Sequence, residues 1–246
     1  MCGRFTQQTS SSDIARIFEA EDLAFDPGER YNVAPTDPAT VVVQRRPADG
    51  EPGRRAVVSY RWGLIPHWAS SDAPKKAASK AFNARAETLT TSGLFRESFL
   101  RRRCLVPVDS FYEWQGVGAA RHPLRIFDGD AGLLALAGLW AGRRDPVSGE
   151  VARTFTIVTS APNAFMAPIH DRMPVVIPRD DWARWLDPST AHLDALRALL
   201  EPRDDIPLAS HPVPKLVNDV RNQGPALIER IDEVAAEPAQ PALELS

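Results

Sequence analysis

Short apolar runs separated by polar stretches recur through the middle of this chain, and they limit what it can fold into. The runs are rich in Val, Ile and aromatic residues, which favour strands. The polar stretches 47–53 and 142–150 carry Gly and Pro between apolar runs, as hairpin loops do. The apolar runs cover residues 40–44, 56–62, 104–108, 133–139 and 154–159. We therefore expect sheet to dominate the middle of the chain.

Helical patterns are fewer and short. Residues 10–12 are serines that can cap a helix, and Ile14, Ile17 and Phe18 follow at helical spacing. Asp180 and Asp181 open another stretch, where acidic residues suit a helix N-terminus. The further helical stretches are 94–101, 180–186 and 190–200. Together with the strands, they indicate an α+β fold.

The chain length and the absence of a repeat favour one domain. The 246 residues can bury one substantial core, and neither loop stretch resembles a linker between domains. No internal repeat of 20 to 50 residues is present in the sequence. We expect a single domain over residues 1–236 and a flexible C-terminal tail over 237–246.

Composition excludes several classes of protein. The two cysteines, Cys2 and Cys104, form no CxxC pair, and the five histidines lack metal-ligand spacing. We therefore expect no metal and no cofactor, and we expect Cys104 to be a small buried residue in its apolar run. No apolar run approaches the roughly 20 residues that cross a bilayer, and the N-terminus lacks the pattern of a signal peptide. We expect no contact with a membrane.

Charge is distributed unevenly along the chain although the net charge is only −3. Residues 54–121 carry twelve Lys or Arg against five Asp or Glu, and residues 180–246 carry six against thirteen. The middle of the chain could therefore face phosphate. Solvated charges spread over several faces would give the same count.

Cys2 follows the initiator Met1, and its small size favours removal of that methionine. Removal would leave an α-amine and a thiol on one residue, with reference pKa values of about 7.7 to 8.0 and about 8.5. Such a 1,2-aminothiol condenses with an aldehyde to a Schiff base, and the thiol then closes a five-membered thiazolidine ring. By position alone, a cysteine at residue 2 can also be incidental.

Seven segments, spread from Cys2 to Pro225, resemble one family in sequence and order. The chain resembles the SRAP family of SOS-response-associated, abasic-site-processing proteins. The segments are MCGRF, RYNVAPT, RWGLIPHWA, FNARAET, RRCLVPVDSFYEW, IHDRMPVVI and VNDVRNQGP. With the strand pattern, the resemblance predicts a predominantly antiparallel, barrel-like β core flanked by short helices.

The resemblance implies four catalytic residues. Cys2 matches the nucleophile that forms a DNA–protein crosslink after Met1 is lost, and Asn83 matches an amide that holds the opened sugar or orients the Cys2 amine. Glu113 matches an acidic proton shuttle, and His170 matches a histidine that helps to open the sugar ring or to reverse the crosslink. By residue type alone, Asn83 could be a turn cap and Glu113 a solvated strand residue.

The resemblance also implies contacts with DNA. The matching arginines would bind phosphate, although each could instead form a surface ion pair. The matching tryptophans would stack on bases beside the lesion, which tolerates any sequence. An Asn and a Pro would shape the same pocket, while Trp62, Trp140, Trp182 and Trp185 are expected in the core. The expected DNA-binding residues are Arg4, Asn32, Pro35, Trp68, Arg85, Trp114 and Arg172.

Three functions follow as alternatives. The first is a crosslinking or lyase-type enzyme that captures abasic sites in single-stranded DNA through Cys2, acting as a monomer in the cytoplasm and on the nucleoid when DNA is damaged. The second is a cysteine peptidase with Cys2 as nucleophile, limited to release of Met1 because only that residue precedes Cys2. The third is a non-catalytic binder of single strands with an incidental Cys2.

Overall fold

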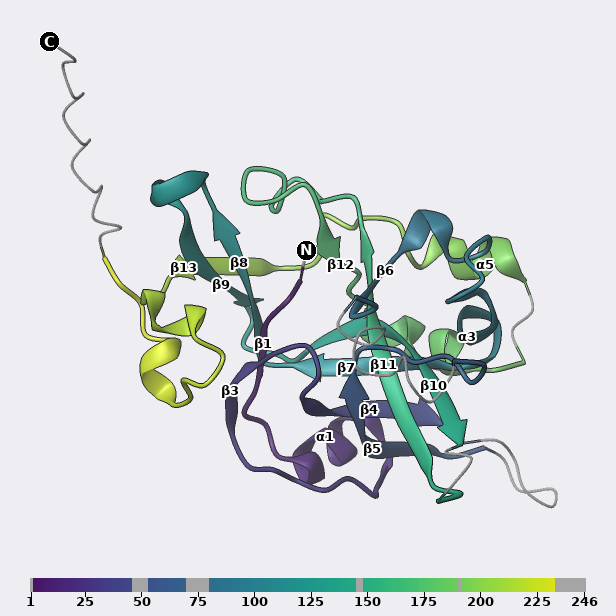
Figure 1. Ribbon diagram of the computed structural model, residues 1–246. Coiled ribbons are helices and arrows are strands. Elements are labelled where there is room, and N and C mark those ends of the chain that lie inside the picture. Colours follow the sequence, from purple (N-terminus) through teal and green to yellow (C-terminus); the bar gives the residue numbers. More distant parts are fainter. Residues whose placement is uncertain (1, 46–52, 70–79, 145–147, 190–191, 233–246) are drawn as a thin grey trace, which may run out of the picture.

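A closed barrel of five strands forms the centre of the computed structural model (Figure 1). The structure describes residues 2–45, 53–69, 80–144, 148–189 and 192–232, so the expected tail 237–246 lies outside the described residues. Four antiparallel pairings run from β5 through β4, β7 and β10 to β11, and a parallel pairing of β11 with β5 closes the ring. The barrel strands are β4 (Pro38–Gln44), β5 (Arg55–Trp62), β7 (Arg103–Val108), β10 (Leu134–Arg144) and β11 (Val151–Ser160). All five expected strands are confirmed, as is the antiparallel, barrel-like core.

Three short strands extend the barrel sheet. β2 (Glu21–Asp22) pairs in parallel with β5, and β6 (Asn83–Arg85) pairs in parallel with β11. β12 (Met173–Pro174) pairs antiparallel with the end of β11. β11 therefore carries β6 and β12 at its C-terminal half, where Asn83 lies opposite Ile157.

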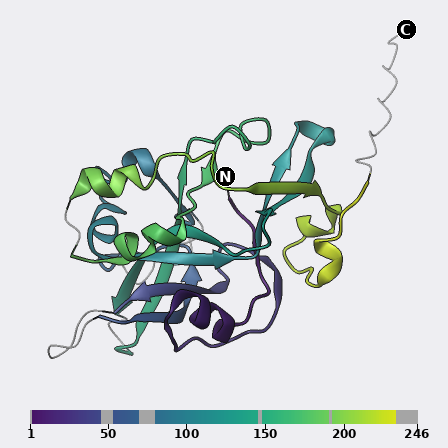
Figure 2. The same ribbon diagram turned by 180° about the vertical axis from the view of Figure 1, so that it is seen from behind.

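A second sheet of five strands stands beside the barrel, and the sequence pattern did not predict it. It has the order β13-β9-β8-β1-β3 and lies on the left of Figure 1 and the right of Figure 2. Only Asp109 separates β7 from β8, so the chain passes from the barrel into the second sheet over one residue. The strands are β1 (Phe5–Gln7), β3 (Arg30–Val33), β8 (Ser110–Gln115), β9 (His122–Asp128) and β13 (Leu208–Pro212).

Short helices cover the outside of the barrel. Ser10 caps the first helix by accepting a hydrogen bond from the Asp13 amide, which confirms the expected cap. None of the described helices is long and apolar enough to span a bilayer. The helices are α1 (Ser11–Phe18), α3 (Arg96–Arg101), α4 (Trp182–Leu186) and α5 (Leu193–Ala198), with 3₁₀ turns at Ala86–Thr88, Gly118–Ala120, Arg179–Asp181, Lys215–Asn218 and Pro225–Leu227.

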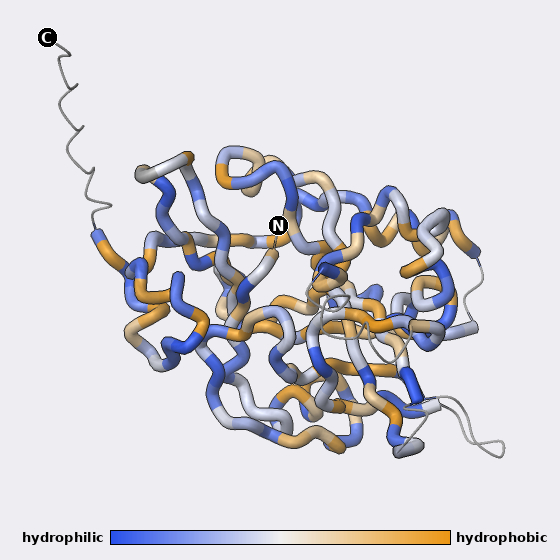
Figure 3. Tube along the Cα trace, viewed as in Figure 1, coloured by the Kyte–Doolittle hydropathy of each residue, from blue (hydrophilic) through white to orange (hydrophobic). Residues whose placement is uncertain are grey.

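Successive residues of the barrel strands belong to two different cores. Val41, Val43 and Cys104 pack with the residues inside the barrel, whereas Val42 and Leu105 pack with the helices outside it. Strands that are buried on both faces favour apolar residues at successive positions, which explains the continuous apolar runs 41–43 and 104–108. Figure 3 shows these runs as hydrophobic segments along the barrel. Three of the four tryptophans expected in the core are buried, and Trp140 is partly buried.

Gly138 lies on β10 where two strands approach closely, and we predict that Gly138→Ala destabilises the protein. A Cβ atom there would lie 2.7 Å from the Cys104 Sγ and 3.0 Å from a Val106 methyl carbon. Overpacking of this kind lowers the free energy of unfolding by about 1 to 3 kcal/mol, which urea denaturation would measure. Gly93→Ala is the matched control, since its Cβ would meet no atom within 4 Å. Equal midpoints for the two variants would contradict this account of the barrel interior.

Candidate active site

Cys2 lies at one end of the barrel, where the chain enters β1. β1 pairs antiparallel with β8, and the Tyr112 amide donates a hydrogen bond to the Arg4 carbonyl oxygen at 3.0 Å. Continuing this register toward the N-terminus brings Gly3 opposite Glu113 and Cys2 opposite Trp114 on β8. The Cys2 side chain is 0% exposed. Burial, and next the charge of Glu113, raise the pKa of the Cys2 thiol far above its ordinary value, so the thiol is held as S–H.

Asn83 holds the backbone of Cys2. Its Nδ2 atom donates a hydrogen bond to the Cys2 carbonyl oxygen at 2.8 Å. Its Oδ1 atom is buried and accepts no hydrogen bond within the described part of the chain. A buried acceptor without a donor is costly, and it suits a site where a ligand or an amine supplies the missing hydrogen bond. Parallel pairing of β6 with β11 fixes this amide beside Cys2.

Glu113 and His170 face each other near Cys2. Glu113 lies on β8 and its side chain is 1% exposed, whereas the His170 side chain is 21% exposed. The His170 Nε2 atom lies 4.0 Å from the Glu113 Oε2 atom. A buried carboxylate facing a half-open imidazole provides a route for protons between the interior and solvent.

Two groups compete for the other nitrogen of His170. The Arg172 amide donates a hydrogen bond to Nδ1 at 2.9 Å, which favours an unprotonated Nδ1 and a proton on Nε2 facing Glu113. The Asp171 Oδ1 atom lies 2.8 Å from the same Nδ1 and favours its protonation. The Asp171 side chain is 87% exposed, so water screens its charge.

The structure therefore brings the four expected catalytic residues together. Cys2 contacts Asn83 through its backbone, and its thiol is close enough to Glu113 for that charge to raise its pKa. Glu113 in turn faces His170. These residues come from β6, β8, the N-terminal segment and the loop before β12, so their proximity depends on the whole fold.

Three of the expected DNA-binding residues instead hold a loop against the second sheet. The Arg4 Nη1 atom donates hydrogen bonds to the Val217 carbonyl oxygen at 2.7 Å and to the Asn32 Oδ1 atom at 2.9 Å. The Trp114 Nε1 atom donates to the Asn218 Oδ1 atom at 2.7 Å. The direct contact of these side chains with DNA stays a prediction, and their observed role is to position the loop.

Asn32, on β3, holds that loop through several hydrogen bonds. Its side chain is fully buried, and its Nδ2 atom lies within hydrogen-bond distance of three carbonyl oxygens. These belong to Val217, Asp219 and Asn222, at 3.2, 3.0 and 3.2 Å. Asn32 therefore fixes residues 217–222, and its role in shaping a pocket for DNA stays a prediction.

We predict that Asn32→Ala loosens this loop. The change leaves three carbonyl oxygens without their Asn32 donor and the Arg4 guanidinium without its Asn32 acceptor. The loss lowers the free energy of unfolding by about 1 to 3 kcal/mol. Hydrogen exchange of residues 216–223 would rise. Asn222→Ala is the control, because that side chain makes one exposed bond, to the Leu216 carbonyl oxygen. Equal protection of the loop in both variants would contradict the role given to Asn32.

The remaining residues expected to contact DNA differ in whether their side chains are exposed or already bonded within the protein. The Arg172 guanidinium donates to both carboxylate oxygens of Glu87, at 2.6 and 3.0 Å, and this hydrogen bonding lowers the pKa of Glu87 below its usual range. The Trp68 side chain is 62% exposed, and Arg85 is exposed beside Asn83 on β6. Pro35 is half-buried in the turn after β3. The side chains of Arg85 and Trp68 are thus accessible to a DNA strand. The Arg172 guanidinium would have to bind phosphate while it is hydrogen-bonded to Glu87.

Sequence reasoning missed three residues that touch this site. Glu87 lies four residues after Asn83 in FNARAET, Asp171 lies between His170 and Arg172, and Asn218 belongs to the late VNDVRNQGP segment. Each stands inside a segment that carries the family resemblance, which was the available signal. Within the described residues, no group of three or more His, Cys, Asp or Glu side chains is arranged to hold a metal ion.

Comparisons with known proteins agree with this geometry. The sequence model of the family described as SOS response associated peptidase (SRAP) matches residues 1–220. The abasic site processing protein YoqW of Bacillus subtilis is 38% identical over 233 residues, covering 93% of this chain and 99% of that protein. The abasic site processing protein HMCES of Gallus gallus is 31% identical and covers 82% of this chain and 66% of its own length.

The fold has close counterparts among solved structures. A crystal structure of a protein from Bacteroides thetaiotaomicron superposes with a TM-score of 0.82 at 23% identity, covering 94% of this chain and all of that one. A second, from Bordetella bronchiseptica, has a TM-score of 0.72 at 25% identity and covers 87% of this chain and all of that one. The match of the family model over most of the chain, and a relative of nearly full coverage, show that this chain belongs to the SRAP family.

Proposed function

We propose that this protein senses abasic sites in single-stranded DNA and captures them covalently through Cys2 after Met1 is removed. The observation that carries the proposal is the convergence of Asn83, Glu113 and His170 on Cys2 at one end of the barrel. Its relatives in Bacillus subtilis and Gallus gallus are named abasic site processing proteins, which supports abasic DNA as the substrate. The adduct would shield the site from strand cleavage.

The state of the thiol decides the order of steps. Because burial holds the Cys2 thiol as S–H, the α-amine attacks the sugar aldehyde first. A carbon–nitrogen bond forms and water leaves, giving an imine. The thiol then adds across the imine: its sulfur bonds to the carbon, its proton passes to the nitrogen, and a thiazolidine ring results. No oxidant or reductant is needed.

The surrounding side chains would supply protons and orientation. Glu113 lies close to the thiol and can accept and return protons as the amine attacks and water leaves. His170 faces Glu113 and can open the sugar ring to its aldehyde form or protonate the ring nitrogen during reversal. The Asn83 Oδ1 atom can accept a hydrogen bond from the Cys2 amine or a sugar hydroxyl.

We predict that Glu113→Gln and His170→Ala slow adduct formation without abolishing it. Each removes one positioned proton donor or acceptor, and such groups contribute roughly 10²- to 10⁴-fold to a rate. Single-turnover formation of the adduct on a gel would measure the loss. Glu201→Gln and His192→Ala, both exposed and outside the four expected catalytic residues, serve as controls. Wild-type rates for both active-site variants would remove their assigned roles.

Peptidase activity limited to release of Met1 is a second candidate, since Cys2, His170 and Glu113 are residue types that a cysteine peptidase uses. The buried thiol opposes a broad peptidase activity, because the thiolate is the nucleophile and burial disfavours it. Offering the protein an abasic strand, an intact strand and an unstructured peptide in parallel separates the functions. We expect a covalent product with the abasic strand alone. Peptide cleavage without a DNA adduct would overturn the proposal.

A further inference from the structure

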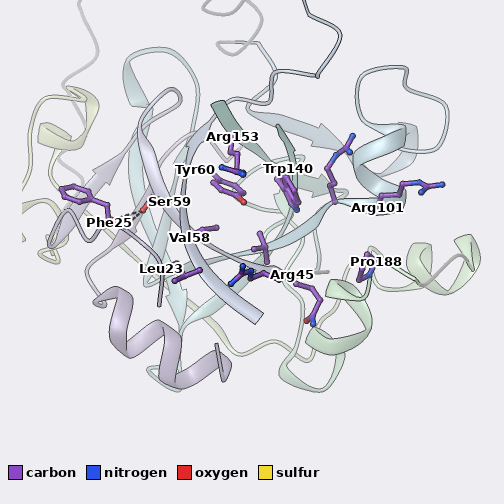
Figure 4. Close-up of a pocket in the computed structure, with 13 residues that line it drawn as sticks. Leu23, Phe25, Arg45, Val58, Ser59, Tyr60, Arg101, Trp140, Arg153 and Pro188 are labelled. Atoms are coloured by element: carbon purple, nitrogen blue, oxygen red, sulfur yellow. Dashed lines mark hydrogen bonds between the residues drawn. The ribbon is translucent and has the colours of Figure 1, made fainter. Parts of the chain in front are cut away.

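A second cavity lies at the other end of the barrel from Cys2, and Figure 4 shows it. Its volume is about 710 Å³, within the range of ligand-binding clefts. Its floor includes Val43, Val58 and Tyr60, which pack with the residues inside the barrel. We call it the barrel-end pocket.

The barrel-end pocket is separate from the Cys2 site. Arg153 lines the pocket near the start of β11, four residues before Ile157, which pairs with Asn83. Four residues along a strand span about 13 Å. None of the catalytic or DNA-binding residues described above lines this pocket.

The charged side chains that line the pocket are all positive. Four arginines line it and no Asp or Glu does. Arg45 is paired with Glu21 at 3.2 Å, and Arg102 is paired with Glu97 at 2.7 Å. Arg101 and Arg153 form no ion pair within the described part of the chain, so their charges are available to an anion.

Aromatic rings stand between these arginines. Tyr60 and Trp140 lie in the middle of the pocket with ring centroids 5.6 Å apart, as Figure 4 shows. Phe25 lies at one end and its side chain is 78% exposed, which is unusual for a ring of that size. Burial raises the pKa of Tyr60 to about 12, so its hydroxyl remains a neutral hydrogen-bond donor. Arginines and an exposed aromatic ring on one surface can bind the phosphates and an unstacked base of a single strand.

We propose that the barrel-end pocket binds a stretch of undamaged single-stranded DNA, with Arg101 and Arg153 on phosphates and Phe25 stacked on a base. The inference rests on the proposed function, since that function supplies single-stranded DNA as the ligand. An acidic peptide could satisfy the arginines, but it would leave the exposed Phe25 without a stacking partner. The pocket would hold DNA by itself, independently of the chemistry at Cys2.

The test measures binding of an intact oligothymidine longer than about 16 nucleotides to the full chain by fluorescence anisotropy at several salt concentrations. Affinity falls as salt rises, and each phosphate contact on a single strand adds about 0.7 to the steepness of log affinity against log salt. The double variant Arg101→Ala with Arg153→Ala should therefore have a slope that is shallower by about 1.4. Arg179→Ala with Arg230→Ala is the control, since both side chains are exposed and outside the pocket. Slopes equal to the wild type in both double variants would overturn the proposal.

A second arm tests the stacking contact and the class of ligand. Phe25→Ala should weaken binding about fivefold or more, whereas Phe25→Tyr keeps a ring and should bind as the wild type does. Competition by polyglutamate as strong as that by DNA, with no effect of Phe25→Ala, would assign the pocket to acidic peptides instead. An intact strand carries no aldehyde, so this assay reports on the pocket even if the wild-type protein fails to crosslink abasic DNA.

Discussion

Cys2→Ala abolishes the heat-stable adduct between this protein and an abasic single strand. The variant keeps an α-amine at residue 2 once Met1 is removed, so it can still form an imine. It lacks the sulfur that closes the ring, and an imine hydrolyses when the protein is denatured. We therefore expect an adduct only when borohydride reduces the imine before heating. Denaturing gels with and without the reductant measure both species.

Cys104→Ala is the matched control for that prediction. Cys104 is the other cysteine of the chain and its side chain is 0% exposed inside the barrel. Its thiol pKa is raised by burial alone, with no contribution from Glu113. Wild-type adduct formation is the expected result. A heat-stable adduct in Cys2→Ala that disappears in Cys104→Ala would move the nucleophile to the barrel interior.

Blocking the N-terminus has an effect of similar size. A short extension that no aminopeptidase removes converts the α-amine of Cys2 into an amide, and an amide nitrogen does not condense with an aldehyde. The thiol alone gives a reversible hemithioacetal, so both the heat-stable adduct and the borohydride-trapped imine should be lost. The extended protein should therefore lose both species, whereas Cys2→Ala loses the heat-stable adduct and keeps the trapped imine.

Restoring the N-terminus should restore the reaction. If a protease site is placed directly before Cys2, cleavage leaves a free cysteine at the N-terminus, and adduct formation should return to the wild-type level. The same cleavage of an extended Cys2→Ala protein is the control. Full crosslinking by the uncleaved, extended protein would show that the α-amine takes no part.

The barrel could be predicted from the sequence because its strands are buried on both faces. Residues such as Val41 and Val42 pack into different cores, so runs such as 41–43 are apolar at successive positions. The second sheet carries mixed residues, for example Glu113 between Tyr112 and Trp114 on β8, and its pairing of β8 with β1 joins segments more than 100 residues apart in the sequence. Local patterns do not contain that pairing.

The identity of the catalytic residues came from the resemblance, but their contacts came from the fold. Arg172 was expected on phosphate because arginine suits phosphate, whereas the structure places it on Glu87, in a segment 85 residues earlier. Asn32 was expected beside DNA, and in the structure its amide holds the 217–222 loop. Side chains of this kind can serve a ligand or the protein itself, and their contact with DNA stays a prediction.

The most direct test of the central claim is the mass of the product. Purified protein is incubated with a single strand that carries one abasic site, heated in denaturant, and weighed by mass spectrometry. We expect a product whose mass equals that of the chain without Met1 plus that of the DNA, less one water. The Cys2→Ala variant should give no such product. Unmodified protein and intact DNA, or an adduct that retains Met1, would contradict the central claim.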